Sequence, residues 1–262
     1  VTGSSVRKNN IYNILADGTG TGTNSSRVFG IYSNSGSITY SNNMVAVGNT
    51  VGLEARITGI EDAGTGTNNY YFNSVSVTGT TAAGSNNSYA FNRSSTATVD
   101  IKDNIFSNTR TGGTGFHVAI ANTNAAATGW AASSSNYNDL YSTAPGNVAQ
   151  WLGSLAANNR SFAGWQAAQG AGTPGSGGDA NSWNVNPSFV SATNLHIPAA
   201  TSTPLESGGT PAGGITTDID NQTRPGPAGS VNGGATQVDI GADEFDGTPA
   251  ASMTYVSSTT TQ

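Results

Sequence analysis

The chain has 262 residues, of which 35% are hydrophobic and 9% charged, with 35 glycines and a net charge of −6. A helical bundle would need more Leu, Glu, Lys and Ala, and the acidic balance argues against binding to nucleic acid or to anionic membranes. There is no cysteine and no apolar stretch long enough to span a membrane, so neither disulfides nor a membrane span can support the fold.

A short phrase recurs five times in the first 140 residues: an apolar position, a pair of mostly small polar residues, and another apolar position. The apolar residues that close the copies are 30 to 35 positions apart, and they are Ile11, Met44, Val75, Ile105 and Leu140. A repeat of this length with strand-type alternation predicts a solenoid of stacked coils. This interpretation requires the first four closing residues to lie in one column along the solenoid axis.

The polar pair inside each phrase predicts a tight corner between two strands, because Asn tolerates left-handed backbone angles and hydrogen-bonds locally. If the corners stack, their side-chain amides can bond to one another along the axis, as in cross-β ladders. The expected rungs are Asn9, Asn42, Asn73, Asn138 and, as an acidic variant, Asp103.

Each coil also contains a further strand candidate after a loop, at residues 28–32, 51–55, 89–91 and 116–120. Beyond the coils, Ser161 is placed to cap a short helix that runs to Gln169 and closes at Gly170. Phe162 and Trp165 lie on one face of that helix, and we expect them to close the open end of the solenoid.

The second half contains a series of phrases in a distinctive order. They are Ser161 to Gln166, Asp179 to Ser182, Asn186 to Val190, Leu195 to Pro198, Thr203 to Leu205, Asp218 to Pro225 and Val238 to Phe245. With the coils, these phrases resemble secreted bacterial right-handed parallel β-helix repeat proteins, a group related in shape to pectate lyases. The resemblance covers roughly residues 4 to 246.

The resemblance implies an all-β, right-handed parallel β-helix of about five coils with a C-terminal cap that contains a short helix. It implies coils in residues 1–140, the last coil or coils and a capping segment in 141–246, and a linker or the start of a following module in 247–262. It also implies a secreted or cell-surface location. Because residue 1 is Val and no signal peptide precedes the repeats, we expect the chain to be a piece of a longer protein.

Acidic residues gather near the C-terminus, where Asp218, Asp220, Asp239, Asp243 and Glu244 lie within thirty residues. One interpretation is a Ca²⁺ site, since hard cations take several carboxylate oxygens. The other is a structural ion pair of Arg224 with Asp239 or Glu244, which we favour because the spacing is not that of an EF-hand. No other cofactor is indicated, and two isolated histidines without cysteine argue against a zinc site.

Charged residues next to the corners are the second candidate site. Arg7, Lys102 and Asp103 could face a glycan, with Lys102 or Arg7 as the base and Asp103 as the acid of a uronate lyase. No pair of carboxylates is spaced as a glycosidase motif. We therefore expect a non-catalytic structural or adhesive module of a larger secreted or cell-surface protein, with cell-surface glycans and other domains of that protein as partners. The alternative is a polysaccharide lyase or hydrolase, or a glycan-binding module, which depends on fold analogy.

Overall fold

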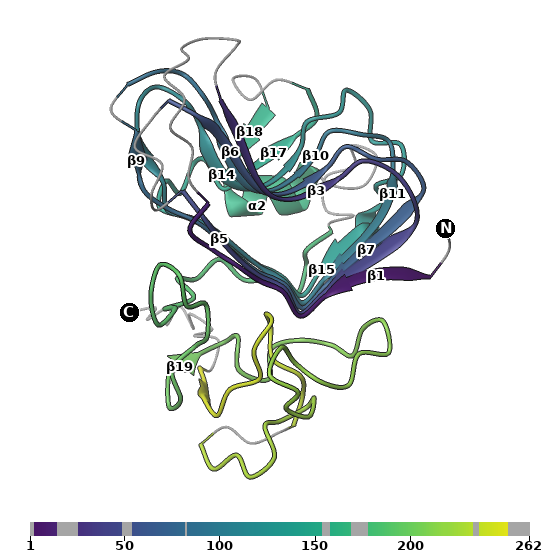
Figure 1. Cartoon of the computed structure of the whole chain (residues 1–262), viewed down its shortest axis with the longest axis vertical. Helices are drawn as coiled ribbons and strands as arrows, with labels where there is room; N and C mark the ends of the chain where they lie inside the picture. Colours follow the sequence, from purple (N-terminus) through teal and green to yellow (C-terminus); the bar gives the residue numbers. More distant parts are fainter. Residues whose placement is uncertain are drawn as a thin grey trace, which may run out of the picture.

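The computed structural model of the chain describes residues 3–14, 26–48, 54–81, 83–153, 158–168, 178–232 and 236–250. Within these residues the chain is an all-β parallel solenoid of about four turns, as Figure 1 shows in a view along its axis. The predicted fold class is thereby confirmed. Five successive passes of the chain stack on one another and contribute strands to three sheets, which form the sides of the solenoid.

The three sheets are called first, second and third in the order in which the chain enters them. The first consists of β1 (Ser4–Arg7), β4 (Ile38–Ser41), β7 (Thr67–Tyr71), β11 (Thr98–Lys102) and β15 (Ser135–Asn136). The second consists of β2 (Asn10–Ile11), β5 (Met44–Val47), β8 (Ser74–Val77), β12 (Ile105–Asn108) and β16 (Asp139–Ser142). The third consists of β3 (Arg27–Ser33), β6 (Arg56–Asp62), β10 (Ser88–Arg93), β14 (His117–Asn122), β17 (Ala149–Trp151) and β18 (Asn159–Arg160).

Neighbouring strands pair in parallel, except that β18 pairs antiparallel with β17. Short elements complete the described fold: β9 (Thr80–Thr81) pairs with β13 (Thr111–Gly112), and β19 (Ser202–Thr203) pairs with β20 (Thr248–Pro249). A 3-10 turn, η2 (Ala132–Ser134), precedes β15, and one helix, α2 (Phe162–Ala168), follows β18.

Three of the four further strand candidates overlap β3, β10 and β14, whereas the one at residues 51–55 lies mostly outside the described residues and its described part, 54–55, is not in a strand. The strand of that coil is β6, which begins at Arg56, and residues 51–53 lie outside the described part. The sequence of β6 does not show the alternation of apolar and polar residues that identifies a strand, because Gly59 occupies an inward position. A Cβ on Gly59 would lie 2.2 Å from a methyl of Val75, so a glycine lets the second and third sheets approach each other.

The expected column of closing residues in the second sheet is confirmed at Ile11, Val75 and Leu140 and is wrong by one residue at Met44 and Ile105. In the structure the members of the column, in register, are Ile11, Val45, Val75, Phe106 and Leu140. Met44 and Ile105 belong instead to the adjacent column, which faces outward. A shift of one residue places a strand side chain on the opposite face of the sheet. Met44 and Ile105 are apolar although they face outward, because the C-terminal part of the chain buries them, with Met44 against Leu195 and Ile105 against Ile240.

An asparagine ladder runs along the corner between the first and second sheets. Each side-chain Nδ2 donates to the Oδ1 of the next coil over 2.8 Å, 2.9 Å, 2.8 Å and 3.0 Å. The rungs are Asn9, Asn43, Asn73, Asn104 and Asn138.

Two expected rungs, Asn42 and Asp103, are therefore not in the ladder. Both occupy the residue just before the rung, where the backbone is left-handed with φ of +52° and +60°. A left-handed residue turns the chain sharply, so its side chain points out of the corner while the next one points in. Lys8, Phe72 and Tyr137 occupy the same position in the other coils, with φ between +54° and +57°.

Asp179 ends the ladder and joins it to the cap. Its Oδ1 accepts from Asn138 Nδ2 at 3.0 Å, and its Oδ2 accepts from Trp165 Nε1 at 2.8 Å. Trp165 is fully buried among Trp130 and Trp151, with ring centroids 5.7 Å and 5.6 Å apart. The expected helix is present as α2, and Ser161 Oγ accepts its Gly164 N–H at 3.2 Å; Gln169 and Gly170 lie outside the described residues.

The remainder of the chain, residues 183–232 and 236–250, is called the flanking segment. It runs beside the solenoid, along the outer face of the second sheet and its corner, rather than over the end (Figure 1). The division at residues 140 and 246 stays a prediction, although β17 shows that solenoid strands continue past 140. The predicted linker or following module at 247–262 falls mostly outside the described residues, since 251–262 are not described.

Candidate functional site

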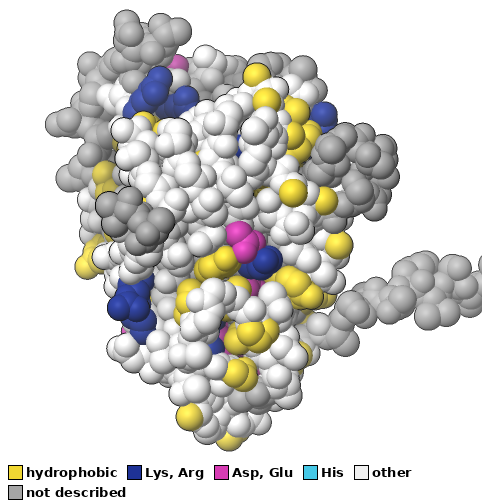
Figure 2. All heavy atoms as spheres, turned by 90° about the vertical axis from the view of Figure 1, so that its right-hand side faces the viewer, with side chains coloured by type: hydrophobic (Ala, Val, Ile, Leu, Met, Phe, Trp, Pro, Cys, Tyr) yellow, Lys and Arg dark blue, Asp and Glu magenta, His cyan; other side chains and the backbone are white. Residues whose placement is uncertain are grey.

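The outer face of the first sheet carries two of the three predicted glycan-facing residues. Val6, Tyr40, Tyr70 and Ile101 point into the core, so their strand neighbours point outward. In register across the strands, one outward row consists of Arg7, Ser41, Tyr71, Lys102 and Asn136. Figure 2 shows this side of the molecule, on which backbone and uncharged polar side chains together predominate over charged and hydrophobic side chains. Arg7 and Lys102 thus share a row but are three strand spacings apart, about 14 Å.

Lys102 is held by its neighbours on the same sheet. Its Nζ lies 2.9 Å from Asp100 Oδ1, and the Tyr71 hydroxyl donates to Asp100 Oδ2 at 2.6 Å. Burial raises the pKa of Tyr71, and the hydrogen bond to Asp100 adds to the effect. The ring of Tyr71 is covered by Ala212 and Val238 of the flanking segment, so it does not offer a face to a sugar.

Asp103, the third of these residues, is sealed beneath the flanking segment. Its side chain is fully buried, and its Oδ1 accepts the N–H of Thr210 at 2.8 Å. Asp139, one coil further on, has the same arrangement, with Oδ1 accepting from Val185 N–H at 3.0 Å. The second carboxylate oxygen of each is buried without a hydrogen-bond partner among the described residues. Burial raises the pKa of both carboxyl groups well above the usual value.

These two buried acids predict that the free energy of unfolding falls as the pH rises. The pKa of each carboxyl group is higher in the folded state than in the unfolded chain. The free energy of unfolding is therefore highest below pH 4, where both states are protonated, and it falls as the pH rises toward the folded-state pKa. Between those values each group contributes a slope of about 1.4 kcal/mol per pH unit. Urea unfolding from pH 5 to 8 measures it. Asp103→Asn and Asp139→Asn should flatten the slope, and Asp100→Asn, on the half-exposed first sheet, is the control; an unchanged slope contradicts the prediction.

A groove of about 340 Å³ lies between the first sheet and the flanking segment. On the sheet side it is lined by Ser5, Arg7, Lys8, Thr39 and Ser41, and on the other side by residues 213–217. Lys8 crosses its edge, where Nζ donates to Thr217 Oγ1 at 3.1 Å and to Asn221 Oδ1 at 2.8 Å. A second groove of about 640 Å³ lies beyond the Tyr71 contact, between Tyr137 and residues 207–210. Both grooves are lined mainly by hydroxyls, amides and backbone.

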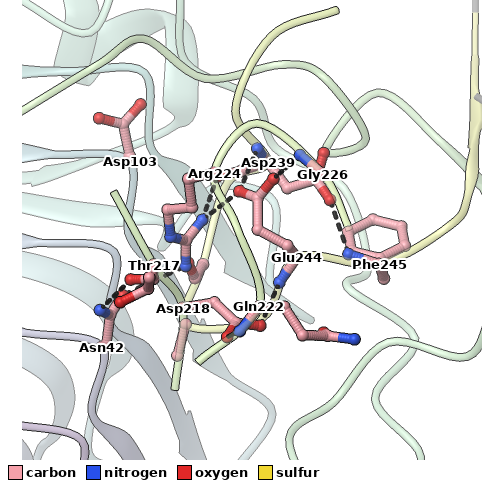
Figure 3. Close-up of polar contacts among 12 residues, drawn as sticks. Asn42, Asp103, Thr217, Asp218, Gln222, Arg224, Gly226, Asp239, Glu244 and Phe245 are labelled. Carbon is pink, nitrogen blue, oxygen red and sulfur yellow. Dashed lines mark hydrogen bonds and ion pairs between the residues drawn. The ribbon is translucent and has the colours of Figure 1, made fainter. Parts of the chain in front are cut away.

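The five predicted metal ligands separate into two groups. Asp218, Asp239 and Glu244 lie near the buried Arg224, and the Glu244 carboxylate faces its guanidinium (Figure 3). Arg224 Nη1 pairs with Glu244 Oε1, and neither side chain is exposed. The favoured structural pair is therefore present, with Glu244 as the partner and Asp239 supplying a backbone carbonyl at 3.3 Å.

The carboxylates of this group are occupied by backbone N–H groups. Asp239 accepts from Ser207 and Phe245 at 2.6 Å and 2.8 Å, and Asp218 accepts from Gln222 at 2.7 Å. Burial raises the pKa of Asp239, and the charge of Glu244 raises it further. These acids order the loops of the flanking segment and hold no converging pair of free oxygens for a cation.

Asp220 and Asp243 form the second group, together with a residue that the sequence interpretation had set aside. One ligand atom each from His196, Asp220 and Asp243 lies within 4.8 Å of the others. Burial raises the pKa of Asp243 to about 6. His196 was missed because it is 24 residues from Asp220 in sequence, and only its position between two apolar residues, Leu195 and Ile197, indicated that its ring points outward.

No family model matches this chain, and comparisons with curated proteins and with solved structures returned no match. Among the described residues there is no helix of the length and apolar character that a membrane crossing requires.

Proposed function

We propose that this chain is a non-catalytic structural or adhesive module of a larger secreted or cell-surface protein, in the bacterial β-helix group that is related in shape to pectate lyases. One observation carries the proposal: the residues with the best chemical claim to catalysis do not converge. Arg7 and Lys102 are about 14 Å apart, Lys102 is paired with Asp100, and Asp103 is sealed under Thr210. A uronate lyase needs its base and its acid group at one open site.

The buried asparagine ladder supports a structural role for the module. The ladder side chains are buried at four of five rungs and bond from coil to coil. Such satisfied buried networks give a stiff and unique structure rather than an adaptable one. The cap packs against the end of the solenoid core, and the flanking segment covers the outer face of the second sheet.

A glycan-binding role without cleavage is the second candidate, and the groove beside Arg7 favours it. Its lining combines a guanidinium, the Lys8 ammonium and several hydroxyls, which suits an acidic polysaccharide better than a neutral one. This is an adhesive function of the same module and does not require a catalytic residue.

A panel of acidic and neutral glycans, assayed with and without chelator, tests both candidates. We expect no formation of new reducing ends or unsaturated uronates. If acidic glycans bind, Arg7→Ala should weaken binding about tenfold, because it removes a bidentate contact in the groove. Lys102→Ala, a paired residue outside the groove, should leave binding unchanged. Cleavage that disappears in Lys102→Ala would overturn the non-catalytic proposal.

A further inference from the structure

Three loops of the flanking segment bring His196, Asp220 and Asp243 together at its surface. Their ligand atoms lie within 4.8 Å of one another. The side chains of His196 and Asp220 are 31% and 54% exposed, so an ion can enter from solvent. Asp243 lies beneath them and is buried.

The imidazole of His196 faces an oxygen acceptor at each ring nitrogen. Nδ1 lies 2.5 Å from Asn194 Oδ1, and Nε2 lies 2.8 Å from Asp220 Oδ2. The Asn194 oxygen also accepts the backbone N–H of His196 at 3.2 Å, which fixes which end of that amide points to the ring. A neutral imidazole has one N–H, so it satisfies only one of the two acceptors. The other nitrogen needs either a second proton or a cation between it and the carboxylate.

Asp243 supplies an independent indication. It is 93% buried, since its relative exposure is 7%. One oxygen, Oδ2, accepts the N–H of Ile197 at 3.1 Å, while Oδ1 has no hydrogen bond with any described residue and remains in contact with solvent. A carboxylate that is mostly buried beside a second carboxylate is destabilised by their repulsion unless a positive charge lies next to them.

We propose that His196, Asp220 and Asp243 bind one Zn²⁺ ion. One imidazole and two carboxylates, with water in the fourth position, form a normal zinc ligand set, whereas Ca²⁺ takes six to eight oxygens. Asn194, which accepts from Nδ1, is the outer partner that orients a metal-binding histidine through Nε2. Zinc ligand atoms are about 3.3 Å apart, a distance the half-exposed Asp220 reaches by a change of rotamer.

The ion ties together three loops that have little regular structure. In the flanking segment the described strands are the two-residue pair β19 and β20. The chain has no cysteine, so a metal would add to the buried Arg224–Glu244 pair as a cross-link between loops of this segment. This inference is independent of the proposed module function, since it concerns how the flanking segment is held.

Isothermal titration of the metal-free chain with Zn²⁺, followed by thermal unfolding, tests the proposal. We expect one ion per chain and a rise in Tm of roughly 5 °C at saturation. His196→Gln and Asp220→Asn, both at exposed positions, should each weaken binding at least about 100-fold. His117→Gln, which removes the only other histidine, is the matched control and should bind as the unmodified chain does.

Two results would overturn the zinc site. One is the absence of Zn²⁺ binding at millimolar concentration, which identifies the contact as an imidazolium–carboxylate pair. The other is binding that survives His196→Gln, or a Ca²⁺ response as large as the Zn²⁺ response, which identifies an all-oxygen site elsewhere. Circular dichroism of each variant verifies that the solenoid is folded before titration.

Discussion

Replacement of Asn73 with Ala is expected to lower the free energy of unfolding by about 3 to 5 kcal/mol, because it orphans several buried polar groups at once. Asn73 is fully buried at the middle of the ladder. Its Nδ2 donates to Asn104 Oδ1 at 2.8 Å and to the Tyr40 carbonyl at 3.0 Å. Its Oδ1 accepts both the backbone N–H and the side-chain Nδ2 of Asn43, at 3.1 Å and 2.9 Å. Urea unfolding monitored by tryptophan fluorescence measures the loss.

Asn9 is the matched control for this experiment. It donates to Asn43 over 2.8 Å but is exposed, so water replaces the contact when Asn9 is changed to Ala. The expected loss is about 1 kcal/mol or less. An equal loss of unfolding free energy in the two variants would show that the stabilisation by the ladder hydrogen bonds does not depend on their burial. Asn73→Leu, which keeps a similar volume and removes every polar atom of the side chain, separates lost hydrogen bonds from lost packing.

Replacement of Arg224 with Met is expected to release the flanking segment, at a cost of about 3 to 5 kcal/mol, because it leaves the buried Glu244 without its counter-ion. Arg224 also donates from Nη2 to Asn42 Oδ1 at 3.2 Å and to Gly241 O at 2.8 Å. Its guanidinium carbon lies 4.3 Å above the ring of Phe72. One side chain therefore links the solenoid corner to two loops of the segment.

Thermal unfolding and limited proteolysis reveal this effect. We expect an early transition in which the flanking segment is cleaved while the solenoid keeps its far-UV circular dichroism, and increased dye binding as Met44 and Ile105 are uncovered. Arg224→Met with Glu244→Leu should recover much of the loss, since the uncompensated charge is gone. Lys102→Met, which breaks a half-exposed ion pair, is the control and should cost about 1 kcal/mol or less. A single transition at the unmodified temperature contradicts the prediction.

Three of the five rungs of the asparagine ladder were predicted from the sequence, and the other two were missed by one residue. In every coil the rung is the residue after a left-handed one, and it is always Asn, as in Phe72–Asn73 and Tyr137–Asn138. Alignment on that Asn, rather than on the apolar residue that closes each phrase, would have selected Asn43 and Asn104. The left-handed residue varies among Lys, Asn, Phe, Asp and Tyr. The sequence interpretation placed Asn at the left-handed residue, because Asn tolerates that backbone angle. In the structure the Asn that recurs is the next residue, and its side chain makes the hydrogen bond to the next coil.

Within the candidate sites, contacts between residues close in sequence could be predicted, and contacts between distant residues could not. The pairing of Arg224 with an acid of the same segment could be predicted, because a lone basic residue among several carboxylates has few other partners. Its contact with Asn42, 182 residues away, could not. The meeting of His196 with Asp220 and Asp243 likewise depends on three loops whose paths leave no periodic signal.

The sequence by itself determined the solenoid, its corners and its capping helix, because the repeat length and the period-two alternation follow from backbone geometry within and between adjacent coils. Only the tertiary structure decided which face of the second sheet looks inward, and that Asp103 is sealed rather than open to a ligand. The physical reason is that alternation distinguishes two faces of a strand without saying what covers the outer one. Here the flanking segment covers it, so the outer face also carries buried apolar residues such as Met44 and Ile105, and charged residues from distant loops come into contact.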